Sequence, residues 1–357
     1  MKKKTALRAL LLSALALLLV LVLTVGGYVT YVLLDYDRIP DRQPLSPVGG
    51  SAETVERGRI YSALTYNIGF AAYTPDFTFF MDGGKQSRAK SRESVLSVMQ
   101  SIGELSRGVS ADFYLFQEVD TDSTRSYHVN EADILKGYFP DFGSVFASNY
   151  HSSYLFWPLL EPHGASNSGL LSLSRFAASD ALRRSLPIAD SLSKFLDLDR
   201  AYTVTRYPVD GGRELVVYNL HTSAYGGSES IRTAQMSMLL SDMQGEYEKG
   251  NYCVAGGDFN HDFSGTSVMH FNGTDADFGW AQPFPTQLLP EGIRRVPDDG
   301  TLPSCRNCDV PYSEDCFVLT VDGFLVSENV TATARVLDVG FAYSDHNPVL
   351  LEFMLMP

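Results

Sequence analysis

The stretch NYCVAGGDFN, residues 251–260, places a polar string directly after an apolar strand pattern. Its two glycines allow a close approach of the backbone to a neighbouring chain, or an unusual turn. Asp258 and Asn260 lie two residues apart, so in an extended chain both side chains point to one face. The stretch predicts a strand that delivers a carboxylate and an amide to one place. An Asp-containing turn that only closes the strand fits it equally well.

Five further strings follow an apolar run and carry Asn, Glu, Asp or His. They are TYNIG (65–69), FQEVD (116–120), NLHTS (219–223), VDGF (321–324) and SDHNP (344–348). Such side chains bind hard divalent cations, carry protons, or orient a group that does so. A fold that brings strand ends together would gather them into one pocket, which is how a metal-dependent phosphoester hydrolase is built.

Two histidines in these strings are candidates for proton transfer. Asp345 and His346 are adjacent, and the nearby Pro348 holds the backbone away from helix at the start of a strand. We expect Asp322 to orient His346 and to fix its tautomer. His221 supplies a second imidazole, which suits proton transfer near neutral pH.

The acidic string at residues 116–120 predicts a metal ligand. Glu118 ends a run that begins with four apolar or aromatic residues, where an unpaired carboxylate would be costly. Its partner is either an arginine or a backbone N–H, or a Mg²⁺ or Ca²⁺ ion, which prefers carboxylate and carbonyl oxygens. Asn67 has the same position on its own strand and offers a neutral amide oxygen.

The remaining chain mixes helices with strands. Apolar spacing predicts helices over residues 91–107 and 228–248, and Asp210-Gly211-Gly212 predicts a hairpin turn. Residues 263–311 are expected to be rich in loops. Strands are expected at 60–68, 112–118, 170–173, 201–207, 214–221, 251–255, 317–326, 334–339 and 349–356. Because strands and helices do not alternate strictly, two packed sheets covered by helices fit better than a doubly wound sheet.

The N-terminal residues 1–34 predict a membrane anchor. MKKKTALR carries four positive charges, and residues 9–34 then run for 26 residues without a charge. This run can span a bilayer, whereas the apolar part of a cleavable signal peptide is only about 7–15 residues long. Because the basic residues precede the span, we expect a single-pass protein of the cell membrane with a cytoplasmic N-terminus. Residues 35–57 are interpreted as a linker, and residues 58–357 as an extracytoplasmic catalytic domain.

The charge of the outer part bears on its partners. All 42 acidic residues and 24 of the 28 basic ones lie beyond residue 34, a net charge of −18. Such a charge repels polyanions at a distance, so nucleic acid is not the favoured partner, although a local basic groove would still permit a nuclease. The sequence does not indicate an oligomeric state.

The four cysteines predict one buried thiol and one disulfide. Cys253 lies in an apolar strand pattern and is expected in the core. The segment CRNCDVPYSEDC lacks a fourth soft ligand for zinc and a βαβ context for redox chemistry. In an oxidising exterior, a disulfide between Cys316 and either Cys305 or Cys308 is expected.

Taken in order, the six strings resemble the endonuclease/exonuclease/phosphatase superfamily over about residues 59–356. The resemblance implies the deoxyribonuclease-I-like fold, an α+β architecture in which two packed mixed sheets form a four-layer α/β/β/α sandwich. In this chain the transmembrane helix predicted within residues 1–34 precedes it. It also implies hydrolysis of phosphoric esters with Mg²⁺, or with Mn²⁺ or Ca²⁺. By this resemblance Asn67, Glu118 and Asp345 hold the metal ion.

The same resemblance assigns catalytic and phosphate-binding residues. Asp258 and Asn260 would hold or polarise the attacking water and the phosphate. His346, paired with Asp322, would contact the scissile phosphate and move protons, and Asp345 would complete the site. His221 matches the other catalytic histidine of the deoxyribonuclease and sphingomyelinase branches.

Three features depart from the family pattern or match it loosely. Arg200 sits where some members place a phosphate-binding cation. Abasic-site enzymes usually carry Asp two residues after the Asn, where this chain has Gly69, so that branch is disfavoured. The family's catalytic tyrosine has no clear match.

Three functions remain open at this point. A small phosphodiester or phosphomonoester, such as a phospholipid headgroup, is favoured because a tethered acidic domain meets lipids at high local concentration. A surface-anchored nuclease acting on DNA or RNA is the alternative, and a membrane-tethered binding module without catalysis is the alternative of another class. The aromatic segment Tyr150–Trp157 could face a membrane, but we expect it to cap the core.

Overall fold

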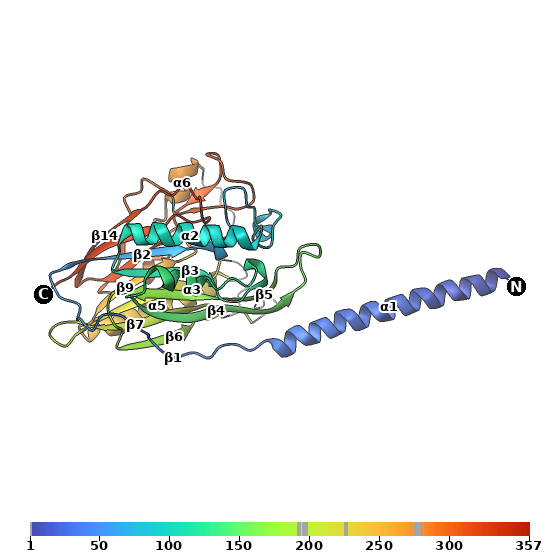
Figure 1. Ribbon diagram of the computed structural model, residues 1–357, viewed down its shortest axis with the longest axis horizontal. Helices are drawn as coiled ribbons and strands as arrows, with labels where there is room; N and C mark the ends of the chain where they lie inside the picture. Colours follow the sequence, from blue (N-terminus) through green and yellow to red (C-terminus); the bar gives the residue numbers. More distant parts are fainter. Residues whose placement is uncertain (1, 191–193, 195–198, 225–227, 275–279, 281) are drawn as a thin grey trace. The chain divides into compact units, whose positions relative to one another are not determined.

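The structure, a computed structural model, describes residues 2–190, 194, 199–224, 228–274, 280 and 282–357. The chain divides into two units, Met1–Arg38 and Ile39–Pro357. The first holds helix α1 (Lys2–Asp35), whose stretch Lys4–Asp35 is long and apolar enough to cross a membrane. The second holds the strands and the other helices (Figure 1).

One sheet of the second unit has seven strands in the order β1-β6-β7-β8-β9-β13-β10. Strands β8 and β9 run parallel, and the other neighbours run antiparallel. The bounds are β1 (Gln43–Leu45), β6 (Asp180–Ser185), β7 (Ala201–Pro208), β8 (Glu214–His221), β9 (Tyr252–Asp258), β13 (Asp322–Ser327) and β10 (Ile293–Val296). The antiparallel pair β7–β8 is the hairpin that the Asp-Gly-Gly turn predicts.

The other main sheet has six strands in the order β14-β15-β2-β3-β5-β4, of which β2 and β3 run parallel. The bounds are β14 (Val330–Val336), β15 (Val349–Leu355), β2 (Ile60–Asn67), β3 (Phe113–Asp120), β5 (Gly164–Ser174) and β4 (Gly143–Leu155). A separate pair joins β11 (Cys305–Arg306) to β12 (Val318–Leu319). The strand expected at 317–326 is therefore two strands, because its first half pairs with β11 and its second half with β9.

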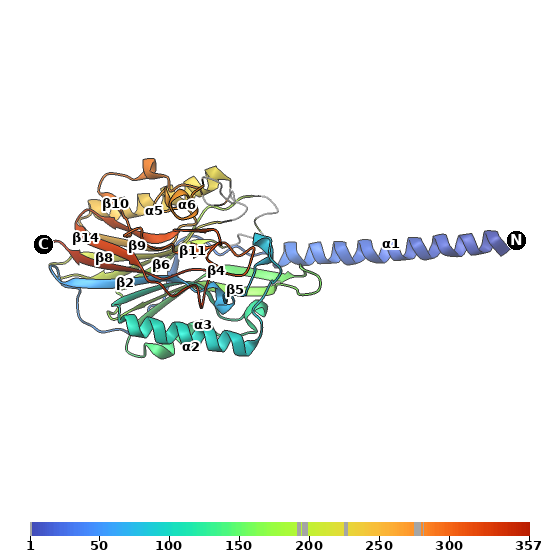
Figure 2. The ribbon, with the colours of Figure 1, turned by 90° about the horizontal axis from the view of Figure 1, so that it is seen from above.

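The helices cover the outer faces of the two sheets, as Figure 2 shows. Helices α2 (Arg92–Val109) and α3 (Glu131–Tyr138) pack on the six-stranded sheet, and α5 (Glu229–Glu248) packs on the seven-stranded sheet. A third apolar layer, which includes Phe113, Leu215 and Phe324, fills the space between the sheets. The architecture is the expected α/β/β/α sandwich. The short elements are α6 (Ser267–Asn272), η1 (Gly69–Ala71), η2 (Phe80–Asp82), η3 (Thr124–Ser126) and η4 (Thr286–Leu288).

The two long helices of the domain form where apolar spacing predicts them. In α2, Ser91 caps the first turn by accepting a hydrogen bond from the N–H of Ser94, and Ser110 ends the helix in a left-handed conformation. Its buried side chains lie on one face and pack on the sheet. The sequence is less informative for β4, because its inward positions are small or polar, such as Ala147 and Asn149.

The hairpin β4–β5 ends in a loop that corrects one expectation. Phe156 and Trp157 are 51% and 65% exposed, so this end of the aromatic segment does not cap the core. The first part of the segment is half-buried.

Part of the segment expected as a linker is ordered against the domain. Within residues 35–57, β1 pairs with β6, and the second unit already begins at Ile39. The N–H of Val55 also donates to the carbonyl of Pro208 (2.9 Å). The free tether is thus shorter than the linker that the composition predicts.

Candidate active site

The polar strings meet at one edge of the sandwich, where the carboxyl ends of β2, β3, β8 and β9 lie. In the six-stranded sheet, the parallel pair β2–β3 brings Asn67 to the end of β3 that carries Glu118. In the seven-stranded sheet, Asp258 lies opposite both His221 and Asp322. The strand directions therefore assemble residues that lie up to 255 positions apart in the sequence.

Buried amides join the two sheets directly next to this edge. Gln117 donates to the side-chain oxygen of Asn219 (2.8 Å). Asn219 in turn donates to the carbonyl oxygens of Phe116 and Leu171 (both 3.2 Å). These bonds fix the two halves of the site, because Gln117 precedes Glu118 and Asn219 lies two residues before a predicted catalytic histidine.

Asp258 lies at the centre of the cluster. Its Oδ2 accepts a hydrogen bond from Nδ2 of Asn67 (3.0 Å) and lies 3.4 Å from Nε2 of His221 and 3.8 Å from Nε2 of His346. Gly257 is required for this approach, because a Cβ there would lie 2.0 Å from the carbonyl oxygen of Leu220. Gly257 of the opening stretch therefore serves close packing of β9 on β8, whereas a Cβ at Gly256 would meet the ring of Phe324 on β13 (2.4 Å).

His346 and Asp322 form the expected pair. Nδ1 of His346 lies 2.7 Å from Oδ2 of Asp322, and both side chains are buried. The hydroxyl of Ser304 donates to the same carboxylate oxygen (2.7 Å) and accepts from the N–H groups of Val321 and Asp322. The carboxylate is thus held in place and leaves Nε2 of His346 directed toward Asp258.

The environment separates the protonation states of the two histidines. Burial disfavours a charged His346, but the charges of Asp322, Cys305 and Asp345, with the hydrogen bond to Asp322, together outweigh burial and raise the pKa of His346 well above its usual value. For His221, burial and the positive charges of Arg200 and His346 lower the pKa well below its usual value. The two shifts favour the charged form of His346 and the neutral form of His221, which is the arrangement that acid–base catalysis needs.

The carboxyl group of Asp258 has a pKa near neutral pH. Burial raises its pKa to about 7, the charge of His346 opposes this rise, and the charge of Asp322 adds to it. Within the described part of the chain, Nδ1 of His221 has no hydrogen-bond partner. The number of protons bound to the cluster can therefore change near neutral pH.

Glu118 is aimed into the site by a distortion of β3. The pairing with β5 shifts register between Phe116 and Val119, and Glu118 itself has a φ of +54°. A bulge of this kind re-aims a side chain at the end of a strand. Oε1 of Glu118 accepts from Nδ2 of Asn67 (3.3 Å), and burial raises its pKa, with the charge of Asp345 adding to the effect of burial.

Asn67 and Asp345 meet around Gly69. The N–H of Gly69 donates to Oδ1 of Asn67 (3.0 Å), and Ser344 donates to the carbonyl of Asn67 (2.7 Å) and to Oδ1 of Asp345 (3.2 Å). Gly69 has a φ of +52°, and a Cβ there would lie 2.6 Å from the ring of Tyr73. The position at which abasic-site enzymes carry Asp is therefore closed to a side chain.

Two groups of residues could hold a metal ion. Asp258, Asp322 and His346 offer ligand atoms that lie within 4.8 Å of one another. However, Oδ2 of Asp322 is already bound by Ser304 and His346, so these residues fit a proton-transfer pair better. Glu118 and Asp345 are only half-buried and repel each other, which an oxygen-preferring cation would relieve. Asn67, as placed, turns its NH₂ rather than its oxygen toward the carboxylates, so it orients Glu118.

Asn260 and Arg200 lie near the cluster but differ from the expectation in detail. Asn260 has a φ of +47°, so the chain is not extended there, and the argument from alternating side chains fails. Its N–H instead donates to Oδ1 of Asp258 (2.9 Å), and its amide donates to the carbonyl of Thr222 (2.9 Å). Arg200 is half-buried, and its charge acts on both Glu118 and His221.

Two further residues at this edge are not predicted from the sequence. Arg125 is buried, makes a bidentate ion pair with Asp120 (3.0 and 2.8 Å) and lowers the pKa of Glu118 against the effect of burial. The guanidinium carbon of Arg125 lies 5.6 Å from the ring centroid of Tyr150 on β4. Burial raises the pKa of Tyr150, and the charges of Arg125 and Arg200 oppose this rise. Neither residue lies in a strand-end string, so only the fold reveals them.

The expected disulfide is absent, and all four cysteines are free and buried. Sγ of Cys305 lies 3.7 Å from Nε2 of His346, and Sγ of Cys308 lies 3.8 Å from Oδ2 of Asp345. Sγ of Cys316 accepts from the N–H of Ser313 (3.1 Å). The three thiols therefore have separate partners, and two of them touch the active site. Cys253 is a core thiol as expected.

Comparison with known proteins identifies the family of the chain. The profile described as "Endonuclease/Exonuclease/phosphatase family" matches residues 64–346, and the chain belongs to this family. A comparison with curated proteins finds no significant match.

Solved structures share the fold at low sequence identity. An endonuclease/exonuclease/phosphatase protein of Beutenbergia cavernae DSM 12333 is 16% identical, with a TM-score of 0.57 over 84% of this chain and 72% of that one. A protein of the same description from Bacteroides vulgatus is 16% identical, with a TM-score of 0.51 over 83% and 99%. ANGEL2, described as a 2′,3′-cyclic phosphatase, is 16% identical, with a TM-score of 0.54 over 89% and 100%.

Proposed function

We propose that the protein is a metal-dependent phosphoesterase that hydrolyses a phosphodiester or phosphomonoester with an activated water. The observation that carries this proposal is the environment of Asp258. Its carboxylate lies within 3.0–3.8 Å of the amide of Asn67 and of two imidazoles. Opposed pKa shifts of the two histidines supply an acid and a base at one carboxylate.

Each residue has a distinct part in this proposal. Asp258 and the neutral imidazole of His221 activate the attacking water and take up its proton, and the amide of Asn260 orients that water. His346, held by Asp322, faces the phosphate as a cation and donates a proton to the departing oxygen. Arg200 binds a phosphate oxygen at the half-buried rim. A Mg²⁺, Mn²⁺ or Ca²⁺ ion held by Glu118 and Asp345 would neutralise the phosphate charge.

The other two interpretations find less support. Every position that the catalytic proposal uses carries a suitable side chain, which argues against a binding module that has lost catalysis. A nuclease would need a basic groove, and the outer part of the chain carries a net charge of −18. A small or lipid-linked phosphoester is the substrate class that we propose.

We also propose that α1 anchors the protein in the cell membrane with its basic end in the cytoplasm. The four positive charges before the apolar run support this orientation. Protease added to intact cells would then remove the second unit and spare the N-terminus. Release of a mature protein that lacks α1 would contradict the anchor.

The function is tested by a substrate panel with the full-length protein in detergent. We expect release of phosphate or alcohol from at least one phosphoester with Mg²⁺ and none with EDTA. His346→Ala should abolish this release, and Asp322→Asn should lower it. His270→Ala is the matched control, because this exposed histidine on α6 lies outside the cluster. Release that survives His346→Ala would overturn the proposal.

A further inference from the structure

The loop between β4 and β5 exposes a group of large apolar side chains. Phe156, Trp157, Leu159 and Leu160 are 51%, 65%, 74% and 100% exposed. Single exposed apolar residues are normal on a soluble surface, whereas four within five positions mark an interaction site. We call residues 156–160 the apolar loop.

The strand register places the apolar loop at the active-site edge. In the pairing of β3 with β5, Asp120 lies opposite Ser168. Since β5 runs antiparallel to β3, the residues before Ser168 extend past the carboxyl end of β3, where Glu118 lies. The N–H of Ala165 is held there by the hydroxyl of Thr124 (3.2 Å). The loop is therefore beyond the site and not at the opposite end of the sandwich.

The start of the second unit is fixed at the same edge. The N–H of Ile39 donates to Oδ1 of Asp199 (2.8 Å), and the other oxygen of Asp199 pairs with Nδ1 of His151 on β4. Arg183 donates to the carbonyl of Asp199 (2.6 Å), and Ser185 donates to the carbonyl of Ile39 (2.9 Å). Asp199 directly precedes Arg200, the proposed phosphate ligand, so Ile39 is held next to the site.

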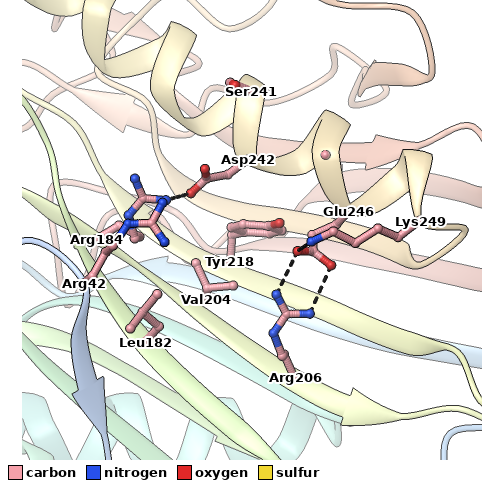
Figure 3. A pocket seen from close by; sticks show the side chains of 11 residues that line it. Arg42, Leu182, Arg184, Val204, Arg206, Tyr218, Ser241, Asp242, Glu246 and Lys249 are labelled. Atoms are coloured by element: carbon pink, nitrogen blue, oxygen red, sulfur yellow. Dashed lines mark hydrogen bonds and ion pairs between the residues drawn. The ribbon is translucent and has the colours of Figure 1, made fainter.

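A second set of contacts holds the following residues. Arg184 of β6 donates to Asp41 (3.0 Å) and also pairs with Asp242 of α5, as Figure 3 shows for Asp242. Arg42, Arg184 and Asp242 line a cavity of about 260 Å³ between β6, β7 and α5. Residues 39–42 are thus tied to β6 and to the chain before β7, and β6 is in turn tied to α5.

The number of residues between α1 and Ile39 limits the distance between them. Helix α1 ends at Asp35, so only residues 36–38 separate it from Ile39. Four Cα–Cα steps of extended chain reach at most about 14 Å. If α1 spans the bilayer, the edge that carries Glu118 and Arg200 is held close to the surface of the same bilayer. An apolar loop at that edge meets lipid.

We propose that the apolar loop inserts into the membrane surface, and that the site acts on the phosphoester of an amphiphile embedded in that membrane. The second part rests on the proposed phosphoesterase function, whereas the insertion does not. Aromatic side chains with an apolar body and a polar N–H, as in Trp157, favour the membrane–water interface. A lipid surface fits better than a protein partner because the neighbouring chain leads directly to an apolar helix.

Fluorescence of Trp157 tests the insertion in the full-length protein. The chain has two tryptophans, so Trp280→Phe leaves Trp157 as the sole emitter. In vesicles of phosphatidylcholine with brominated acyl chains, we expect its emission to fall at least twofold relative to ordinary phosphatidylcholine. Equal emission in the two kinds of vesicle would overturn the insertion.

A matched reporter at the opposite end of the sandwich provides the control. Ile60 is 70% exposed and begins β2, whose carboxyl end carries the site. The variant Trp157→Phe, Trp280→Phe, Ile60→Trp places a single tryptophan there. Its emission should be the same in both kinds of vesicle. Equal quenching of both reporters would mean that the domain lies flat or inserts nonspecifically, and would overturn the proposed orientation.

Activity measurements test the substrate class. Leu160→Ser should lower hydrolysis of a vesicle phospholipid at least tenfold and leave hydrolysis of the soluble diester bis(p-nitrophenyl) phosphate within twofold. Ile60→Ser should change neither rate. Equal loss on both substrates would overturn the membrane substrate. If the unaltered protein hydrolyses neither, the proposed function fails, while the quenching result still decides the insertion.

Discussion

On the outer face of the seven-stranded sheet, Glu246 of α5 is surrounded by donors, whereas Asp258 at the active-site edge of the same sheet is not. Arg206 binds both oxygens of Glu246 (2.8 and 3.0 Å), as Figure 3 shows, and Lys249 and Asn251 add bonds of 2.7 and 2.8 Å. Among the described residues, Asp258 accepts instead from one amide and one backbone N–H, beside two imidazoles.

The protonation of the two carboxyl groups differs accordingly. Burial opposes ionisation in both. At Glu246 the hydrogen bonds from Arg206, Lys249 and Asn251 outweigh burial and lower the pKa to about 2. At Asp258 burial prevails, and the pKa rises to about 7. A carboxylate with a full set of cationic donors serves stability, whereas one without them is available for proton transfer.

The largest expected difference is in turnover. Asp258→Asn should reduce hydrolysis about 10³-fold, on the scale of losing a general base. Glu246→Gln should leave the rate within threefold, because Glu246 lies on the outer face and not at the edge. Steady-state rates of the two variants with Mg²⁺ provide the measurement. Similar losses in both would mean that the comparison has no functional meaning.

Metal dependence is the next largest effect. Glu118→Gln keeps the size of the side chain but removes the charge that would hold the cation. We expect a loss of about 10² or more, on the scale of a key catalytic group. Circular dichroism should show an unchanged fold. Near-normal hydrolysis by the variant, or activity untouched by EDTA, would contradict the metal assignment.

Loss of the ion pair of Glu246 should lower the stability of the protein rather than its turnover. Its pKa is lower in the folded than in the unfolded state, so its contribution is present above about pH 4 and is lost as pH falls toward 2. Glu246→Gln should lower the free energy of unfolding by about 1–3 kcal/mol at pH 7, as for hydrogen bonds to a charged group. Urea unfolding in detergent at pH 7 and pH 3 should show the deficit shrink at the lower pH. A deficit that grows there would refute the assignment.

The smallest effect has the opposite sign. Asp258 has a raised pKa, so the folded state holds a proton that the unfolded state releases between about pH 4 and pH 7. Stability therefore falls as pH rises through that window. In EDTA, Asp258→Asn should raise the Tm by about 2 °C or more at pH 8 and leave it unchanged near pH 4. A lower Tm of the variant at pH 8 would show that Asp258 is stabilised as a carboxylate.

The sequence predicts the sandwich and most of the site because both depend on strand ends. Apolar runs locate β2, β3, β8 and β9, and the polar residue after each run then falls at a shared edge. What the sequence does not reveal depends on local geometry. The bulge at Glu118, the left-handed conformation of Asn260 and the separate partners of three thiols have no periodic signal. Arg125 and Tyr150 reach the site only through the packing of distant elements.

The N-terminal segment and the aromatic segment show the same limit. Composition predicts a helix and a linker, but not that Ile39 is bound by Asp199. The composition of the aromatic segment Tyr150–Trp157 predicts a position in the core. The sequence does not reveal how far the hairpin extends beyond the sheet, and this length decides whether its tip is buried. Hydrophobicity alone does not distinguish a core cap from an exposed loop.

Hydrolysis in ¹⁸O-labelled water tests the central claim most directly. The protein is incubated with Mg²⁺ and a phosphoester that it cleaves, and the products are examined by ³¹P NMR. Attack of an activated water on phosphorus predicts that the phosphoryl product carries one ¹⁸O, with no label in the released alcohol. Label in the alcohol, or a protein that binds Mg²⁺ but cleaves no phosphoester, would contradict the account.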